Sequence, residues 1–298
     1  FVYAGLPDQQ EEEDRAAAEQ NQLPELDKVL VLGRGDEGFL FNFGAFVIDG
    51  FGWGHAIGMS QYGASGPAAK GRSHAEVLAH YYRGTQLGTV DGVRMRVLVH
   101  VPEGAFSVVS GTPFVARGVD GTELEIPAGS VKVNKKLALI LGADKVALAL
   151  PFTFVPGEQP LEVGGRSYRG MLNVHDTKDG VLIVNDVGLE SYLYGVVPDE
   201  MPPLWEMEAL KAQAVAARSF ALATRRASGL FDAYSDTRSQ VYGGIASEHP
   251  RTTQAVDETR GQVVMHEGAI ASTFFFSTSG GRTAAIEDVW RGSSPVPY

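Results

Sequence analysis

The stretch GVVPDEMPPLWEMEALKAQAVAARSFAL, residues 195–222, decides how the rest of the chain is organised. Two prolines and an acidic pair interrupt a strand-like run, and an alanine-rich segment follows them. Proline is tolerated in the first turn of a helix, where the amide hydrogen has no intrahelical partner. The pattern therefore predicts a long helix from about residue 203, with Glu200 just before its start.

One face of this predicted helix combines aliphatic residues with two cations. Its members, at spacings of seven, four, three and four residues, are Leu204, Lys211, Val215, Arg218 and Leu222. A solvated helix face usually mixes charges of both signs and carries few large apolar residues. We therefore expect this face to turn toward the protein, with Lys211 and Arg218 directed at a carboxylate or a ligand. In the alternative, both side chains lie over apolar surface and keep their charged heads in water.

Several blocks of sequence carry a family resemblance. They are GVVPDEMP (195–202), EALKAQAVAAR (208–218), DTRSQVYGG (236–244), AVDETRG (255–261), STSGGRT (277–283) and GHAIGMSQYGA (54–64). Together they resemble the stage II sporulation protein D family, peptidoglycan lytic transglycosylases that are related to the amidase-enhancer proteins. The resemblance covers most of residues 38–298. It implies that Glu200 corresponds to the catalytic glutamate, whereas Asp199 and Glu206 have no such match.

Seven further residues are candidates for binding a glycan. They are His55, Ser60, Gln61, Lys211, Arg218, Gln240 and Ser279. His55 and Gln61 are the polar side chains offered by a loop with four glycines in residues 50–58, a composition that suits close approach of the backbone to a ligand or to its own neighbours. Gln240 and Ser279 are candidates for hydrogen bonds to sugar, although both residue types also commonly tie down turns.

The order of the blocks differs from that of the better-known family members, in which the Gly-His block follows the Ser-Gly-Gly block. Here the Gly-His block comes first. This order predicts a circular permutation, which is tolerated where the two ends of a fold lie close together. We expect His55 to lie near Glu200, and a strand at residues 39–49 to complete the sheet. Ala56 stands where the family usually has glycine, and its methyl group is expected to narrow the allowed backbone angles.

The remaining pattern predicts an α+β fold with a mostly antiparallel sheet, a long helix at the catalytic site and several shorter helices. Four regions are expected along the chain. They are an acidic flexible tail at residues 1–29, a strand with the Gly-His loop and short helices at 30–92, a β-rich subdomain at 93–187, and a catalytic core with the Glu200 helix and the Ser-Gly-Gly turn at 188–298.

Local signals place the smaller elements. Helices are expected at 59–69, 73–82 and 252–259, a short helix or turn at 189–195, and strands at 262–265 and 270–276. Ser73 and Glu76 have the spacing of a capping box, in which each side chain accepts a hydrogen bond from the other residue's backbone. Glu190 begins the segment at 189–195, where a glutamate commonly caps backbone amides.

Composition argues against several classes of function. The net charge is −11, from 36 acidic and 25 basic residues, whereas a nucleic-acid partner needs clustered Lys and Arg. No apolar run approaches the ~20 residues that span a membrane. The chain has no cysteine, which excludes disulfides and the Cys-containing zinc site of some relatives. His74 and His80 are six residues apart and share no helix face, so we expect no metal and no cofactor.

The ends of the chain bear on its location. It begins at Phe1 and ends at Tyr298, directly after a Pro-Val-Pro run. We therefore expect a processed or excised piece, with a signal or anchor outside it. The family resemblance implies an extracytoplasmic location, either secreted or associated with the cell wall.

Cleavage of a glycosidic bond requires a proton on the leaving oxygen. As the resemblance implies, a lytic transglycosylase uses the substrate's own muramyl C6 hydroxyl and ends in a 1,6-anhydro sugar. One carboxylate can then serve first as acid and afterwards as base. Met201 and Pro202 are expected to desolvate Glu200 and to raise its pKa, whereas Lys211 and Arg218 would oppose that rise if they lay close.

The leading hypothesis is a lytic transglycosylase that cuts MurNAc–GlcNAc strands after an amidase has removed the stem peptides. Its rival is a non-catalytic peptidoglycan-binding module that stimulates an N-acetylmuramoyl-L-alanine amidase. A third hypothesis is a two-carboxylate glycosidase, in which Asp236 or Glu190 joins Glu200 at a separation of roughly 5–9.5 Å. The expected partners are glycan strands and a cell-wall amidase.

Overall fold

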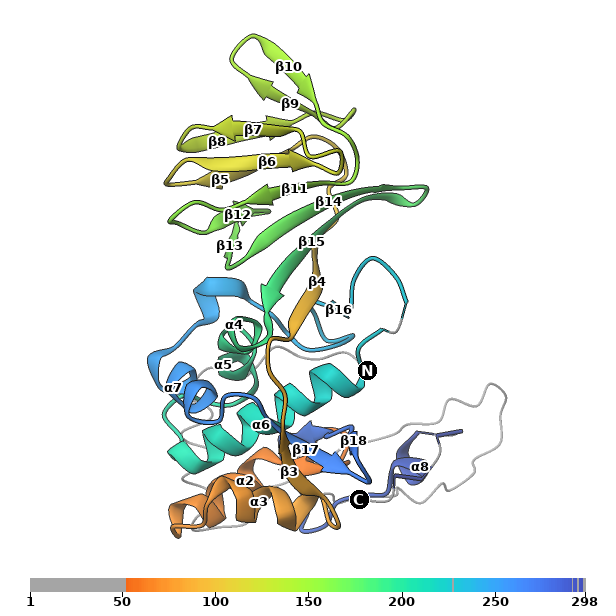
Figure 1. Ribbon diagram of the computed structural model, residues 1–298. Coiled ribbons are helices and arrows are strands. Elements are labelled where there is room, and N and C mark those ends of the chain that lie inside the picture. The colour runs from red at the N-terminus through yellow and green to blue at the C-terminus, as the bar shows by residue number, and fades with distance from the viewer. Residues whose placement is uncertain (1–51, 227, 291, 294, 297–298) are drawn as a thin grey trace, which may run out of the picture.

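The computed structural model describes residues 52–226, 228–290, 292–293 and 295–296. A β-rich body lies at one end, and helices gather around α6 (Met207–Ala223) at the other (Figure 1). The fold is α+β with mainly antiparallel strand pairing, which confirms the predicted class. The predicted tail at 1–29 and the predicted strand at 39–49 lie outside the described residues.

Two sheets build the β-rich body, in the orders β16-β4-β15-β14-β11-β6-β7 and β10-β9-β8-β5-β12-β13. Their strands are β4 (Arg94–His100), β5 (Phe106–Ser110), β6 (Phe114–Gly118), β7 (Glu123–Ile126), β8 (Gly129–Val133), β9 (Ala138–Leu141), β10 (Asp144–Ala147), β11 (Phe152–Val155), β12 (Leu161–Val163), β13 (Arg166–Tyr168), β14 (Met171–Thr177), β15 (Gly180–Gly188) and β16 (Ala233–Tyr234). Burial alternates along strands such as β5 and β6, because successive side chains of a strand point to opposite faces. The buried faces form one apolar core, which includes Val108, Leu139 and Phe154.

The strands β4, β14 and β15 lead from this body toward the helices (Figure 1). Antiparallel pairing joins β15 to β14 along its length and to β4 on its other side. The helix α4 (Leu189–Tyr194) begins directly where β15 ends. The end of a strand that is paired on both sides therefore sets the position of the segment that leads to Glu200.

The long helix α6 is buried on all sides. Ala214 packs into the core of the β-rich body, Val215 into a second cluster with α2 and α3, and Ala209 into a third cluster with α7. Small alanine side chains let neighbours approach every face, and the face that carries Lys211, Val215 and Arg218 turns toward the protein as predicted. The predicted start is wrong, because α6 begins at Met207 and Leu204 lies before it with 66% of its surface exposed.

The smaller elements largely confirm the predicted positions. They are α2 (Gln61–Ala69), α3 (His74–Tyr81), β3 (Gln86–Thr89), α5 (Val197–Glu200), the 3-10 helix η1 (Gly244–Ser247), α7 (Pro250–Glu258), β17 (Gln262–His266) and α8 (Ile286–Val289). Ser73 and Glu76 form the predicted capping box at the start of α3. The single strand predicted at 270–276 is instead two short strands, β18 (Ala269–Ile270) and β19 (Phe275–Phe276).

The Gly-His block pairs directly with the last part of the chain. The strand β1 (Gly52–Trp53) runs antiparallel to β20 (Thr278–Ser279), and β2 (Met59–Ser60) runs parallel to β19. The two blocks therefore share one local structure although they lie at opposite ends of the described chain, as the predicted permutation requires. No helix in the described ranges is both long enough and apolar enough to cross a bilayer.

Candidate functional site

Glu200 is the last residue of a separate one-turn helix and not the residue before the long helix. Pro198 occupies the first turn of α5, and the chain leaves the helix at Met201 in an extended conformation. The residue before a proline disfavours the helical region, so Pro202 ends the helix here. Met201 is buried, whereas Glu200 itself stays partly exposed. This arrangement presents a carboxyl group at the border between apolar core and solvent.

The pKa of Glu200 is raised from its ordinary value of 4.5 to about 8. Burial is the larger cause, because it disfavours the charged form, and the negative charge of the neighbouring Asp199 adds to it. Asp199 has a raised pKa as well, but hydrogen bonds from Ser247 and from the Gly243 amide partly offset the effect of burial. Among the described residues, no hydrogen bond or ion pair reaches the Glu200 carboxyl. The Glu200 carboxyl therefore keeps its proton to a higher pH than an exposed glutamate does.

The amide of Gln61 ties the Gly-His block to Glu200. Its Nε2 donates to the Glu200 carbonyl oxygen at 2.6 Å and to Gln213 Oε1 at 3.4 Å. Gln61 is the first residue of α2 and Gln213 lies on α6, so three segments meet behind Glu200. The Nε2 of Gln213 is buried and has no hydrogen-bond partner in the described part of the chain. Gln61 thus positions the backbone of Glu200. The sequence predicted Gln61 only as a residue that binds the glycan.

Ser60 fastens the Gly-His block to the Ser-Gly-Gly turn. Its hydroxyl donates to the Ser277 carbonyl at 3.2 Å and accepts from the amides of Gly63 at 3.1 Å and Ser279 at 3.3 Å. Only 1% of Ser60 is exposed, so the residue orders the loop from inside. Gly58 permits the close approach, because its φ is 76° and a Cβ there would lie 2.0 Å from the Phe274 carbonyl oxygen.

The imidazole of His55 lies among aromatic rings. Ring centroids are 5.2 Å away for Trp290, 5.6 Å for Phe276 and 6.2 Å for Phe274. Its Nδ1 accepts a hydrogen bond from the Ile57 amide at 3.1 Å, and burial lowers its pKa, so the ring is neutral at pH 7. The Phe275 backbone also reaches the ring. No hydrogen bond or ring contact in the described chain joins His55 to Glu200, so the predicted proximity of the two side chains stays a prediction. The loop reaches Glu200 through Gln61 instead.

Ala56 adopts the backbone conformation that usually needs glycine. Its φ is 61°, in the left-handed region. The Ala284 amide donates to its carbonyl at 2.7 Å and holds the conformation. An L-residue in this region costs roughly 1–2 kcal/mol relative to the right-handed helix. The methyl group that distinguishes this loop from the family pattern is therefore a source of local strain.

The two cations of α6 bind carboxylates of the protein. Lys211 Nζ lies 2.7 Å from Glu208 and 2.7 Å from Glu258 on α7. Arg218 is fully buried and makes a two-pronged ion pair with Glu190, at 2.5 Å and 3.1 Å. Arg218 also donates to the carbonyls of Gln262 and Val256. Both cations therefore hold α6 to its neighbours, and their predicted contact with substrate finds no support in this geometry.

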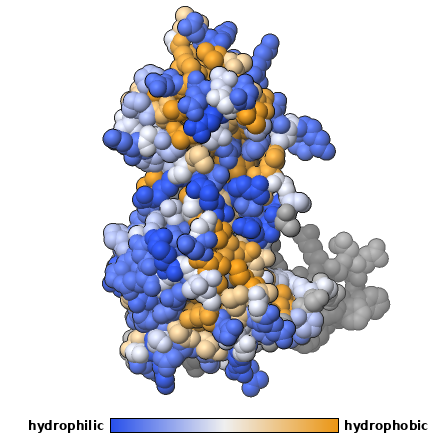
Figure 2. All heavy atoms as spheres, in the orientation of Figure 1, coloured by the Kyte–Doolittle hydropathy of each residue, from blue (hydrophilic) through white to orange (hydrophobic). Residues whose placement is uncertain are grey.

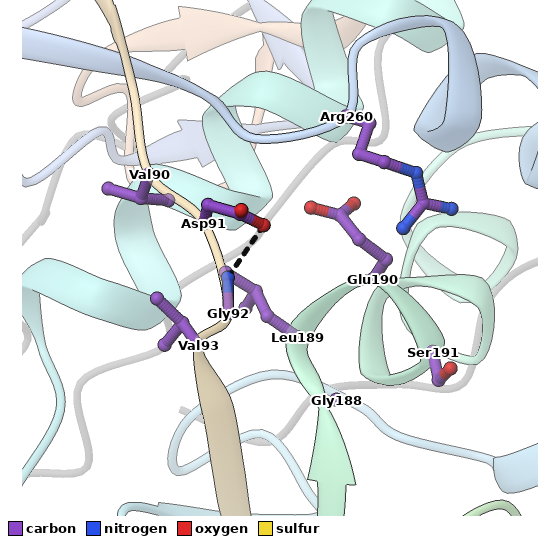
Figure 3. A pocket seen from close by; sticks show the side chains of 9 residues that line it. All are labelled: Val90, Asp91, Gly92, Val93, Gly188, Leu189, Glu190, Ser191 and Arg260. Atoms are coloured by element: carbon purple, nitrogen blue, oxygen red, sulfur yellow. Dashed lines mark hydrogen bonds between the residues drawn. The ribbon is translucent and has the colours of Figure 1, made fainter.

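Glu190 has a structural role, but not the predicted one. It does not cap its own helix, because the start of α4 has no side-chain cap. Its carboxylate instead accepts from Arg218 and from the Gly261 amide at 3.1 Å. Figure 3 shows Glu190 at the wall of a cavity of about 210 Å³, which it shares with Asp91 and Arg260. Glu200 does not line this cavity.

The remaining predicted binding residues differ in their surroundings. Gln240 is 3% exposed, and its amide accepts from Tyr192 Oη at 3.3 Å and donates to the Ala217 carbonyl at 3.4 Å. Ser279 is partly exposed, and its hydroxyl has no hydrogen-bond partner within the described ranges. The Ser279 hydroxyl thus remains available to a ligand, whereas the Gln240 amide joins α4 to α6.

Several residues near Glu200 escaped the sequence analysis. Tyr192 is completely buried, and its pKa is raised first by burial and then by the charge of Glu200. The rings of Tyr62 and Trp205 pack edge to face with centroids 4.6 Å apart. Tyr62 directly follows Gln61, and Trp205 lies in the loop after Glu200. Trp53 on β1 is 60% exposed. Aromatic residues within or beside most blocks of the resemblance were the available signal.

The described residues contain no cluster of three or more His, Cys, Asp or Glu side chains arranged to hold a metal ion. The two carboxylates considered as partners of Glu200 in a two-carboxylate glycosidase are both held in ion pairs. Asp236 is bound by Arg238 at 2.7 Å, and Glu190 by Arg218. The arrangement around Glu200 is suited to proton transfer by one carboxyl group.

Comparison with known proteins finds similarity to the family whose motifs the sequence resembles. Residues 177–266 match the family model described as stage II sporulation protein. An uncharacterized protein of Brachyspira hyodysenteriae is 40% identical over 139 residues, which is 46% of this chain and 37% of that protein. An amidase enhancer of Bacillus subtilis is 43% identical over 106 residues, which is 36% of this chain and 14% of the relative.

The stage II sporulation protein D of Bacillus amyloliquefaciens is 35% identical over 132 residues, 39% of this chain and 38% of the relative. The chain thus spans well under half of the length of these relatives. The segment matched by the family model runs from the end of β14 to β17 and contains Glu190, Glu200, Lys211, Arg218 and Gln240. Through this segment, the chain is similar to the stage II sporulation protein D family.

Proposed function

We propose that this protein cuts the glycan strands of peptidoglycan as a lytic transglycosylase, with Glu200 as its general acid and base. The observation that carries the proposal is the Glu200 carboxyl, which is partly exposed, lacks a protein partner in the described chain and has a pKa raised to about 8. A general acid is most effective when its pKa lies near the working pH. The names of the relatives place related chains in sporulation and in the enhancement of an amidase.

The reaction needs only this one carboxyl group. Glu200 gives its proton to the oxygen that links MurNAc C1 to GlcNAc, and the C1–O bond breaks. The muramyl C6 hydroxyl then bonds to C1, and its proton returns to the Glu200 carboxylate. The products are a 1,6-anhydro-MurNAc end and a free GlcNAc hydroxyl, with no water consumed. The first step requires a carboxyl that is neutral, which matches the raised pKa, and the second uses the carboxylate that the first step leaves.

Aromatic side chains support a sugar-binding role for the surface beside Glu200. Tyr62 and Trp205 form one ring pair there, and Trp53 lies on the strand that pairs with the Ser-Gly-Gly turn. Aromatic rings provide a rigid apolar face with a polar edge, which suits a ligand that is apolar on one side and polar on the other. In this proposal, these rings receive the faces of successive sugars and Ser279 donates to a sugar hydroxyl.

Mass spectrometry of digested, peptide-free glycan tests the proposal. The wild type is expected to produce anhydro-muramyl ends, with activity that falls above a pH of about 8 as Glu200 loses its proton. Glu200→Gln is expected to be folded and inactive, whereas Glu206→Gln, six residues along the chain, is expected to retain activity. Reducing ends in place of anhydro ends, or full activity in Glu200→Gln, would overturn the assignment.

A second candidate is supported by the amidase enhancer of Bacillus subtilis, which is 43% identical over 106 residues. In that case the chain binds glycan without cutting it and stimulates an N-acetylmuramoyl-L-alanine amidase. The expected signature is retained glycan binding, no cleavage, and faster release of stem peptides when an amidase is present. Either activity requires access to peptidoglycan, so an extracytoplasmic location is part of both candidates.

A further inference from the structure

A second concave site lies at the junction between the β-rich body and α6, away from Glu200. A cavity of about 370 Å³ is lined by Arg94, Arg96, Asp186, Arg225, Arg226 and Asp232. The four arginines and two aspartates leave a local charge of +2, in a chain whose net charge is −11. Figure 2 shows mostly hydrophilic atoms at the level where β4 and β16 lie in Figure 1. A concentration of positive charge against the overall sign is expected to attract an anion.

The first wall of this cavity is rigid. Arg94 and Arg96 alternate along β4 and therefore point to the same face of the strand. Arg96 is held by both oxygens of Asp232, with Nη2 to Oδ1 at 2.8 Å and Nε to Oδ2 at 3.2 Å, and by the Gly229 carbonyl at 3.1 Å. Arg94 is held by Asp186 through Nε at 2.6 Å. The Nη1 group of Arg94 makes no hydrogen bond within the described chain, so it remains available to a ligand.

The second wall comes from the loop that follows α6. The amide of Arg226 donates to the Asp232 carbonyl at 3.1 Å, and the amide of Asp232 donates to the Arg96 carbonyl at 2.7 Å, which ties the loop to β4. The Arg226 guanidinium lies 4.8 Å from the centroid of the Phe231 ring and donates to Tyr234 Oη at 3.1 Å. Most of its N–H groups are therefore unused. The Arg225 guanidinium makes no hydrogen bond or ion pair with any described residue.

We propose that this cavity binds a phosphate group carried by a small polar molecule such as a sugar or polyol phosphate. The free donors come from two separate segments, β4 and the loop after α6, so they converge from different directions. This geometry matches a tetrahedral phosphate better than a planar carboxylate, which one guanidinium fork can satisfy alone. The charge of +2 matches a phosphate dianion.

The dimensions favour a small ligand over a polymer of nucleotides. The volume lies in the range of roughly 300–1,000 Å³ that is usual for small-molecule sites. A nucleic acid would have to approach a chain with a strong net negative charge, whereas this cavity carries a local charge of +2. Glu200 does not line this cavity, so the proposed phosphate site can be tested separately from the proposed glycan cleavage.

Titration of the whole chain followed by NMR tests this site, at constant ionic strength so that simple screening does not contribute. Inorganic phosphate and glycerol 3-phosphate are expected to cause saturable shifts confined to β4 and the loop after α6, whereas glycerol and acetate are not. Arg225→Gln is expected to weaken phosphate binding at least fivefold, and Arg225→Gln with Arg226→Gln at least tenfold. Because the Arg225 guanidinium makes no hydrogen bond or ion pair with a described residue, its single variant should fold normally.

A matched control removes two positive charges elsewhere. Arg83 and Arg117 are exposed arginines outside the cavity, and Arg83→Gln with Arg117→Gln is expected to bind phosphate like the wild type. Equal weakening in the control and in the double cavity variant would overturn the proposal, because the effect would then be one of overall charge. Shifts that do not saturate, acetate binding as tight as phosphate, or tighter binding of a single-stranded oligonucleotide would each overturn it as well.

Discussion

Replacing Glu200 with glutamine should stabilise the folded protein at neutral pH while it removes the proposed proton donor. The ordinary pKa of this carboxyl is 4.5, and burial together with Asp199 raises it to about 8 in the folded state. Between these two values, the folded protein keeps a proton that the unfolded chain has released. The stability of the wild type therefore falls as the pH rises through this window. Glutamine has nearly the same shape and no charge, so the variant lacks this loss.

The size of the effect follows from the width of the window. Each unit of pKa difference corresponds to about 1.4 kcal/mol, so at pH 7 the wild type has lost about 3 kcal/mol at most. Partial exposure of Glu200 reduces this figure, because solvent screens the charge. No described residue donates a hydrogen bond to the carboxyl, so the substitution removes no such bond.

Urea denaturation at pH 4.5, 6 and 7 measures the prediction. The free energy of unfolding of Glu200→Gln should be close to that of the wild type at pH 4.5 and should exceed it increasingly as the pH rises. Glu206→Gln is the control, because Ser65 Oγ donates to that carboxylate at 2.7 Å and an amide oxygen can accept the same bond. A variant that is less stable than the wild type at pH 7, or a difference independent of pH, would refute the raised pKa and with it the case for Glu200 as an acid.

Three further changes test the structural roles of other residues by the same denaturation assay. Glu190→Gln should lower the stability by about 3–5 kcal/mol, because it leaves the buried charge of Arg218 without its partner; a loss under 1 kcal/mol would contradict the buried ion pair. Ala56→Gly should raise the stability by about 1 kcal/mol, whereas Ala69→Gly at the exposed end of α2 should lower it; a loss in both would show that Ala56 is not strained. Lys211→Met should cost no more than about 1 kcal/mol and leave glycan binding unchanged, and a large loss of binding would restore Lys211 to the substrate site.

The sequence predicts best what local chemistry decides. The capping box of Ser73 and Glu76 is visible in the sequence because both partners lie within one turn of helix. The start of α6 was misplaced because a second proline and a tryptophan separate Glu200 from Met207, and the chain uses them for a loop. Propensity alone does not distinguish a helix that starts early from one that starts after such a loop.

The partners of charged side chains could not be predicted from spacing. Lys211 and Arg218 share a face of α6, and the sequence left open whether a carboxylate or a ligand receives them. The structure supplies Glu258 from α7 and Glu190 from α4, each brought into place by tertiary packing. A buried guanidinium needs a partner, but the identity of that partner depends on which helices pack against α6. The same reason hides the electrostatic influence of Glu200 on the buried Tyr192.

The order of blocks along the chain matters less to this site than the bonds between them. Gln61 bonds to Glu200 across 139 residues, and Ser60 bonds to Ser277 across 217 residues. These bonds, with the pairing of β2 to β19, fix the Gly-His block against the Glu200 loop whichever of the two comes first in sequence. A chain that carries the block at its other end can make the same bonds, provided that the connection is rerouted over the surface. The permuted order is therefore compatible with an unchanged site, because the site is defined by contacts that close in three dimensions and not by succession along the chain.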